Sequence, residues 1–302
     1  MQENTSPARP GWLGFLQVLI IAAVVVFVLG GCAVQGPNDN HTLEAHASPR
    51  LYVFDCGTIY YDTIAAFGVN DDESDVREMI VPCYLIDHPA GRLFWDGGLP
   101  IAQAGSSERV EAAPGLYTVY PRSVVDQLAR LNLTPDDIEQ VSFSHLHFDH
   151  AGAANLFAKS QLLIQQAEYD TAFGPVEQLP TGFVPSLYSE LRDSRRRLLN
   201  GDHDVFGDGS VQIISTPGHT PGHQVLLVRL ANYGPVVLSG DLYHFRFSRA
   251  QRRTPAFNTS RERTLQAMDR VEALLVAEGA TLWIEHDMAL FKTLAKSPAY
   301  YD

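Results

Sequence analysis

Four side chains that can bind a metal ion fall within six consecutive residues, and this cluster limits how the chain can fold. They are His145, His147, Asp149 and His150, and bulky apolar residues fill the two gaps between them. A strand buried in a core does not carry this pattern, because such polar groups are costly to bury without partners. Imidazole and carboxylate are ligands that zinc accepts, and a cluster without cysteine suits a catalytic site that keeps a position for water. The segment therefore predicts a catalytic metal site.

Each candidate ligand follows a segment with the pattern of a β-strand. Gln140–Ser144 runs straight into His145, which places the cluster at the carboxyl end of a strand. Active sites in layered α/β folds favour that location. Three later strand patterns lead in the same way to His219, Asp241 and His286. Four strand ends would thus bring seven ligands together.

The rest of the pattern is that of one α/β domain over residues 50–302. Short apolar segments between turn residues predict strands, and helical spacing with capping residues predicts helices. The polar segment Asn70–Glu78 is expected to be a surface loop that could shape a pocket rim. The expected strands are Leu51–Cys56, Ile80–Ile86, Arg92–Trp95, Gln140–Ser144, Leu162–Gln165, Val211–Ser215, Gln224–Arg229, Val236–Ser239 and Thr281–Glu285. The expected helices are Ser123–Leu131, a short one at Thr134–Asp137, Asp149–Phe157 and Ser260–Glu278.

The order of the ligands along the chain, HxHxDH followed by H, D and H, resembles that of the metallo-β-lactamase superfamily. The resemblance covers essentially everything after residue 50 and implies an α/β fold, the αββα four-layer sandwich. It also implies two divalent metal ions, for which zinc is expected. His145, His147 and His219 would hold one ion, Asp149, His150 and His286 the other, and Asp241 would bridge them.

A pair of ions held in this way implies hydrolysis. Two cations about 3.5 to 4 Å apart that share a hydroxide lower the pKa of water toward about 7, which supplies a nucleophile at neutral pH. The ions also polarise the attacked carbonyl. Asp149 is placed to move the proton, because a metal-bound carboxylate beside the hydroxide is within hydrogen-bond reach.

Within the superfamily the chain resembles the N-acyl homoserine lactonases, the quorum-quenching enzymes that open the lactone ring of bacterial signals. Residues 81–86, 144–152, 216–224 and 298–301 carry this resemblance in combination. It implies a small-molecule lactone or ester as the substrate and attack by the hydroxide that bridges the two metal ions.

One position departs from this resemblance. Lactonases have a tyrosine three residues after the bridging aspartate, where its hydroxyl helps to bind the lactone carbonyl, and here that residue is His244. Tyr243 is adjacent, but in extended backbone its side chain would point elsewhere. Either His244 substitutes as the donor or the loop is shifted. Both residues are therefore catalytic candidates, together with Asp149.

Other hydrolases with the same two-metal site are alternatives. A true β-lactamase is disfavoured by Asp241, since those enzymes usually have cysteine or no ligand there. Glyoxalase II shares the ligands but normally adds a helical domain, and this chain ends soon after His286. A phosphotriesterase or esterase stays open. A different class, a non-catalytic lipoprotein that binds a metal ion or an acyl signal, also remains.

The N-terminal segment predicts export. Pro10–Asn38 has no charged residue, and Trp12–Leu29 is almost continuously apolar, which fits a signal peptide or a membrane anchor. Leu29-Gly30-Gly31-Cys32 resembles a bacterial lipobox, whose cysteine carries lipid after cleavage. An uncleaved anchor with a chance cysteine is the alternative. We therefore expect a lipoprotein signal peptide at residues 1–32, a polar tether at 33–49 and a hydrolase domain at 50–302, anchored by lipid to the bacterial cell envelope.

The net charge of the chain is strongly acidic. It has 22 Lys and Arg against 35 Asp and Glu, a formal charge of −13. Such a surface repels nucleic acid and anionic lipid headgroups, so nucleic acid is not an expected partner. Two divalent ions would offset part of this charge. The composition carries no indication of the oligomeric state.

Two cysteines remain after Cys32. Cys56 and Cys83 could pair in an oxidising periplasm. Both also lie in apolar, strand-like segments, where a reduced cysteine packs well as a small hydrophobe. The sequence leaves both possibilities open.

The other histidines are expected outside the metal site. A solvated surface position is favoured for His41, His46, His88 and His203, and a supporting or packing role for His223. In the turn Trp95–Gly98, Asp96 has either a structural role in a tight turn after the strand or a hydrogen bond that supports the metal ligands.

Overall fold

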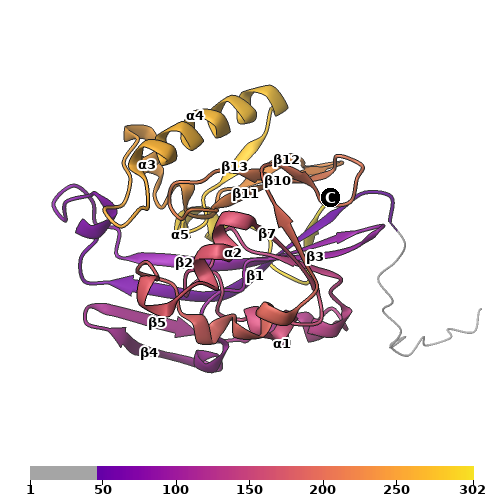
Figure 1. Ribbon diagram of the computed structural model, residues 1–302, viewed down its shortest axis with the longest axis horizontal. Helices are drawn as coiled ribbons and strands as arrows, with labels where there is room; N and C mark the ends of the chain where they lie inside the picture. The colour runs from indigo at the N-terminus through magenta and orange to yellow at the C-terminus, as the bar shows by residue number, and fades with distance from the viewer. Residues whose placement is uncertain (1–45) are drawn as a thin grey trace, which may run out of the picture. The chain divides into compact units, whose positions relative to one another are not determined.

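Two β-sheets pack face to face in residues 46–302, the part of the chain that this computed structural model describes (Figure 1). The first sheet has the order β4-β5-β1-β2-β3-β6-β7-β8, and β14 pairs with β1. Its β3, β6, β7 and β8 are parallel neighbours. The strands are β1 (Arg50–Tyr61), β2 (Glu78–His88), β3 (Gly91–Trp95), β4 (Ser106–Ala113), β5 (Leu116–Tyr120), β6 (Gln140–Ser142), β7 (Gln161–Gln165), β8 (Arg196–Leu199) and β14 (Tyr300–Tyr301).

The second sheet has the order β13-β12-β11-β10-β9. Its strands pair antiparallel except for β12 and β13, which run parallel. The central strand β11 is buried along nearly its whole length, as its sequence QVLLVRL suggests. The strands are β9 (His203–Asp204), β10 (Val211–Ser215), β11 (Gln224–Leu230), β12 (Gly234–Leu238) and β13 (Thr281–Trp283).

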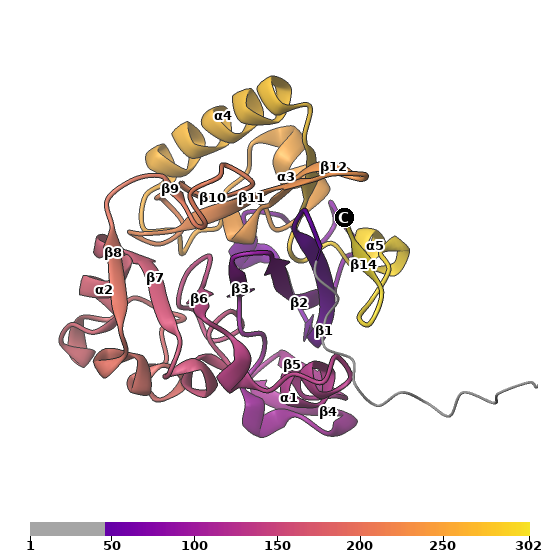
Figure 2. The same cartoon turned by 90° about the vertical axis from the view of Figure 1, so that its right-hand side faces the viewer.

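Helices cover the outer faces of both sheets (Figure 2). The longest, α4, lies on the second sheet. It begins after Ser260, whose side chain accepts a hydrogen bond from the Arg263 N–H, and ends at Gly279 in the left-handed conformation. The α-helices are α1 (Val124–Ala129), α2 (Gln166–Ala172), α3 (Arg246–Gln251), α4 (Arg261–Glu278) and α5 (Met288–Thr293).

Three apolar layers hold these elements together. Side chains of β1, β2 and β3 meet those of β10, β11 and β12 between the sheets, around Trp95 and Trp283. A second layer, with Met268 and Val271, lies between the second sheet and α4. The third lies on the outer face of the first sheet, where Val124 and Leu128 of α1 pack. The predicted αββα four-layer sandwich is confirmed.

The nine expected strands are all present, but the expected helix Asp149–Phe157 is wrong. Only Ala154–Phe157 forms a 3-10 helix there. The backbone before it turns toward residues 97–98 instead, with Gly152 N–H donating to Gly98 O at 2.9 Å. A Cβ at Gly152 would lie 2.1 Å from the Leu99 backbone, so this close approach requires glycine. Packing of the metal motif against that turn overrides its helical spacing.

A disulfide bond joins Cys56 of β1 to Cys83 of β2, where both residues are fully buried. It thereby resolves the two possibilities that the sequence leaves open. Gly98 packs directly on it, and a Cβ there would lie 2.3 Å from Cys56 Cβ. The disulfide thus lies against the turn that supports the metal motif.

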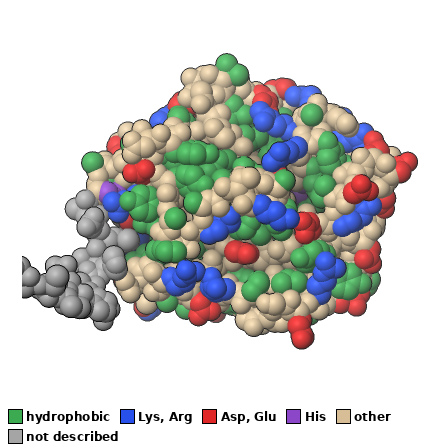
Figure 3. All heavy atoms as spheres, turned by 180° about the vertical axis from the view of Figure 1, so that it is seen from behind, with side chains coloured by type: hydrophobic (Ala, Val, Ile, Leu, Met, Phe, Trp, Pro, Cys, Tyr) green, Lys and Arg blue, Asp and Glu red, His purple; other side chains and the backbone are tan. Residues whose placement is uncertain are grey.

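The expected signal peptide, Cys32 and nearly all of the tether lie outside the described residues. Within residues 46–302, no helix has both the length and the apolar character needed to cross a membrane. On the face of the molecule in Figure 3, cationic and anionic side chains are interspersed with small apolar patches.

Candidate metal centre

The seven predicted ligands converge at one edge of the two sheets. His145, His147, Asp149 and His150 lie in the loop after β6, and His219 follows β10. Asp241 lies in a 3-10 helix after β12, and His286 follows β13. All seven are at most 7% exposed. The strand-end placement predicted from the sequence is confirmed.

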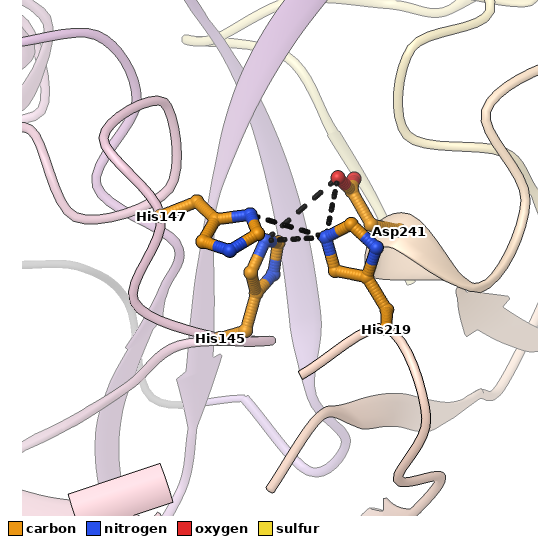
Figure 4. Close-up of side chains that lie close together, drawn as sticks. All are labelled: His145, His147, His219 and Asp241. Carbon is orange, nitrogen blue, oxygen red and sulfur yellow. Dashed lines mark hydrogen bonds and ion pairs between the residues drawn. The ribbon is translucent and has the colours of Figure 1, made fainter. Parts of the chain in front are cut away.

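Four of these side chains form a first cluster (Figure 4). His219 Nε2 lies 3.1 Å from both His145 Nε2 and His147 Nδ1, and 3.2 Å from Asp241 Oδ2. Burial, followed by the neighbouring histidines, lowers the pKa of His145 and His147 well below its usual value. Their neutral form is the one that binds metal. Three imidazole nitrogens and one carboxylate oxygen make a donor set that suits zinc.

Asp149, His150 and His286 form a second cluster. Asp149 Oδ2 lies 3.9 Å from the Nε2 atoms of both histidines. His150 Nε2 is buried without a hydrogen-bond partner in the described part of the chain. A buried nitrogen that faces other ligands and has no hydrogen-bond partner is the arrangement expected of a metal ligand. The residues therefore fit a second ion.

Asp241 joins the two clusters through its two carboxylate oxygens. Oδ2 faces His219 of the first cluster, while Oδ1 lies 2.9 Å from His286 Nε2 and 3.2 Å from His150 Nε2. Burial alone would raise the pKa of Asp241, but the surrounding histidines, with His244 first, hold it well below its usual value. A carboxylate with one oxygen in each cluster can bridge two cations.

The sequence pattern of the metallo-beta-lactamase superfamily matches residues 76–278. The chain belongs to the metallo-beta-lactamase superfamily.

Known relatives place the chain near one branch of this superfamily. The N-acyl homoserine lactonase AttM of Rhizobium radiobacter is 31% identical over 262 residues, which are 83% of this chain and 98% of that protein. An N-acyl homoserine lactonase of Bacillus sp is 28% identical over 76% of this chain and 93% of its own length. The family resemblance predicted from the sequence is confirmed.

Solved structures agree on the fold. An N-acyl homoserine lactone hydrolase with N-hexanoyl-L-homoserine bound at its catalytic metal center matches 84% of this chain and 100% of its own, with a TM-score of 0.72 and 23% identity. AidC, a dizinc quorum-quenching lactonase, matches 84% of this chain and 94% of its own, with a TM-score of 0.60 and 15% identity. Both likenesses show the metallo-beta-lactamase fold.

The outer ring nitrogens of the ligands are held by neighbours in this metallo-beta-lactamase site. Asp96 accepts a hydrogen bond from the Ser144 N–H at 2.6 Å and lies 3.3 Å from His150 Nδ1. This arrangement agrees with the supporting role that the sequence allowed for it. Asn258 Oδ1 lies 2.9 Å from His219 Nδ1. Such contacts fix each ring in an orientation in which its other nitrogen could bind an ion.

Sequence reasoning missed Glu168 of α2, which ties two ligand loops together. Its buried carboxylate accepts from the Leu146 N–H at 2.9 Å and from the Thr220 hydroxyl at 2.7 Å. It also accepts from the Gly222 N–H at 3.0 Å. A single acidic residue in a segment with no assigned helix gave no signal. Asn258 was missed as well, because a single amide side chain outside any motif gave no signal.

A third group, Asp96, His150 and Glu285, lies behind the second cluster. His150 faces it with Nδ1 and faces the other ligands with Nε2. Burial, and then the Asp96 carboxylate, raise the pKa of Glu285 well above its usual value. Glu285 is a further buried acidic residue beside the ligands that the sequence did not indicate.

The two other catalytic candidates lie in different places. His244 is buried at the metal site, with Nε2 2.9 Å from Asp241 Oδ2. The Tyr243 hydroxyl instead donates to Glu272 of α4 at 2.8 Å. Its extended backbone turns it away from the ligands, as alternation along the chain anticipates. Tyr243 is therefore corrected from a catalytic candidate to a packing residue.

The remaining histidines differ in part from expectation. His223 Nε2 accepts from the Asp241 N–H at 3.0 Å, so it supports the bridging residue. The surface position expected for His88 is wrong. Its ring is 8% exposed, stacks on Phe206 at 4.0 Å and lies 2.9 Å from Asp208. Phe206 and Asp208 come from a loop of the other sheet, and the sequence pattern could not show that this loop lies against His88. His41 lies outside the described residues.

Two hollows reach the metal site. A cavity of about 210 Å³ touches both clusters, and a groove of about 820 Å³ reaches His244 and His286. Residues 75–78, the end of the segment Asn70–Glu78, line the groove, which confirms the predicted pocket rim.

Proposed function

We propose that this protein hydrolyses the lactone ring of N-acyl homoserine lactones with two divalent metal ions, and that these ions are zinc. The observation that carries the proposal is the similarity to N-acyl homoserine lactonases over 98% of the length of AttM. The seven side chains that would bind those two ions lie in two groups that could each hold an ion. The chain would thus inactivate a bacterial signal by opening its ring.

The side chains divide the work among them. Two divalent cations, when bound, supply a hydroxide at neutral pH and polarise the carbonyl that it attacks. His145, His147 and His219 would hold the first ion in their neutral forms. His150, His286 and Asp149 would hold the second, and Asp241 would keep the two ions close enough to act on one substrate. The remaining oxygen of Asp149 can hold the proton that the leaving alcohol needs.

The types of donor atom support zinc as the metal that is bound. The two clusters offer imidazole nitrogens and carboxylate oxygens, and no cysteine lies among them. Such mixed sites suit zinc and leave room for water and substrate.

A substrate panel tests the proposal. The full-length protein in mild detergent, loaded separately with zinc, cobalt or manganese, is given acyl homoserine lactones, a β-lactam and an aryl phosphotriester, and acid release is followed. We expect the lactones to be opened fastest. Equal or faster β-lactam or phosphotriester cleavage would reject the lactonase assignment, and binding without turnover would indicate a pure metal-binding protein.

We also propose that the protein is exported and lipid-anchored through Cys32. The apolar segment Trp12–Leu29 and the lipobox-like residues after it support this location. The disulfide between Cys56 and Cys83 supports it as well, since disulfides persist in oxidising compartments and are rare in the cytosol.

A further inference from the structure

The 210 Å³ cavity over the two clusters is where a substrate can meet the metal ions. It is lined by four residues of the ligand set, His147, Asp149, Asp241 and His286. Apart from the metal site and His244, its side chains are apolar except for three hydroxyls, on Tyr61, Thr63 and Thr181. A substrate carbonyl in this cavity would therefore find few hydrogen-bond donors.

Tyr61 is the best-placed of the three hydroxyls. Thr63 and Thr181 are exposed, whereas Tyr61 is partly buried at the end of β1. Its backbone N–H donates to Arg77 O at 2.9 Å, and its ring meets the edge of Phe67 at 5.2 Å. Backbone and ring are thus both held. Tyr61 is also one of the residues that line the cavity over the two clusters.

Tyr61 keeps its phenolic proton at neutral pH, because the ordinary pKa of a phenol is about 10. Asp149 and Asp241 of the metal site line the same cavity as Tyr61. A phenol that keeps its proton is a hydrogen-bond donor.

His244, the residue at the family's tyrosine position, is already engaged. A neutral imidazole has one N–H, and at His244 the nitrogen near Asp241 Oδ2 is Nε2, at 2.9 Å. That nitrogen holds the bridging carboxylate rather than a substrate. Of the three hydroxyls that line the cavity, Tyr61 then offers the least exposed donor for a substrate.

We propose that the Tyr61 hydroxyl donates a hydrogen bond to the carbonyl oxygen of the lactone as negative charge develops there, in place of the tyrosine that His244 replaces. This inference rests on the proposed lactonase function. In the reaction, the oxygen of water bonds to the carbonyl carbon and the ring C–O bond breaks. The released alkoxide takes a proton that water supplied, and Tyr61 keeps its own proton throughout. Tyr61 acts only on the charge that develops in the transition state, so loss of its hydroxyl should lower kcat.

Tyr61→Phe tests this role with a change of one oxygen atom. Tyr243→Phe is the matched control, because it removes a phenol hydroxyl that points at Glu272 instead of the cavity. The full-length protein and both variants are compared for metal content, for kcat and KM on N-hexanoyl homoserine lactone, and for the Kd of the open-chain product by calorimetry.

We expect Tyr61→Phe to keep its metal content and to lose at least about tenfold in kcat, with KM changed by less than about threefold. Its Kd for the product carboxylate should rise about fivefold or more. Tyr243→Phe should match the unaltered protein in all three. A kcat within about twofold, or a change confined to KM, would overturn the role of Tyr61 while leaving the lactonase assignment intact. If the unaltered protein opens no lactone, the function and this inference fail together.

Discussion

His244 Nε2 lies 2.9 Å from Asp241 Oδ2, the carboxylate oxygen that also faces the first metal cluster. The imidazole therefore contacts the bridging ligand directly, although His244 belongs to neither ligand group. The residue at the position where the sequence resemblance implies a tyrosine thus contacts the support of the metal centre.

His244→Ala should lower turnover by about tenfold while both metal ions are retained. The variant removes the contact that orients Asp241, and losses of such orienting partners typically cost about 10 to 100-fold. The measurements are kcat on an acyl homoserine lactone and metal content on the same sample. Unchanged kinetics would remove His244 from the mechanism, and loss of an ion would make it a ligand.

Glu168→Ala should weaken metal binding by about tenfold or more and lower the melting temperature. Three donors, including the Leu146 and Gly222 N–H groups, lose their buried acceptor, and each orphaned group costs about 1 to 3 kcal/mol. Metal titration and thermal unfolding measure the two effects. Asp170→Ala is the control on the same helix, because within residues 46–302 its exposed carboxylate accepts only from the Gln166 side chain. Equal behaviour of the two variants would show that Glu168 does not hold the loops.

Metal affinity at the second cluster should rise with pH. Burial lowers the pKa of His286, but the carboxylates of Asp241 and Asp149 outweigh it and raise the pKa to about 9. The bound proton must leave before an ion binds, so the apparent affinity should increase about tenfold per pH unit between pH 6.5 and 9.

The raised pKa of His286 also makes the stability of the metal-free protein depend on pH, but this stability falls as the pH rises. A histidine whose pKa is raised on folding stabilises the fold fully below pH 6.5, and that contribution is lost as pH rises through 9. Competition titrations with a chelator, and denaturation after metal removal, test the two trends. A flat affinity over this range would show that His286 is not protonated in the metal-free site.

Cys32→Ala should abolish lipid attachment and leave the N-terminal segment uncleaved. If Cys32 carries lipid, its loss removes both the lipid and the cleavage site, so the apolar segment Trp12–Leu29 stays on the protein. Fractionation of cells, with mass spectrometry of the N-terminal peptide, distinguishes the outcomes. A lipid on Cys32 in the unaltered protein is expected, whereas an intact N-terminus in the membrane would indicate an uncleaved anchor.

The sequence predicted the metal ligands and the fold because both leave local patterns. His145 to His150 are adjacent in the chain, and nine apolar segments mark strands whose faces must be buried. No local pattern marks Glu168, Asn258 or Tyr61, since each acts on partners far away in the sequence. The exposed strand β4 has polar residues on both faces. The sequence did not predict it, because it has no apolar face. The helix expected at 149–157 failed because packing on residues 97–99 outweighs local spacing.

The count of metal ions bound per chain, measured together with lactone turnover, tests the central claim most directly. Purified full-length protein loaded with zinc should retain two ions and open acyl homoserine lactones. Asp241→Ala should retain fewer than two and lose at least about a hundredfold in turnover, because its two oxygens serve both clusters. An unaltered protein that holds no divalent ion, or an Asp241→Ala variant with full metal content and activity, would contradict the account.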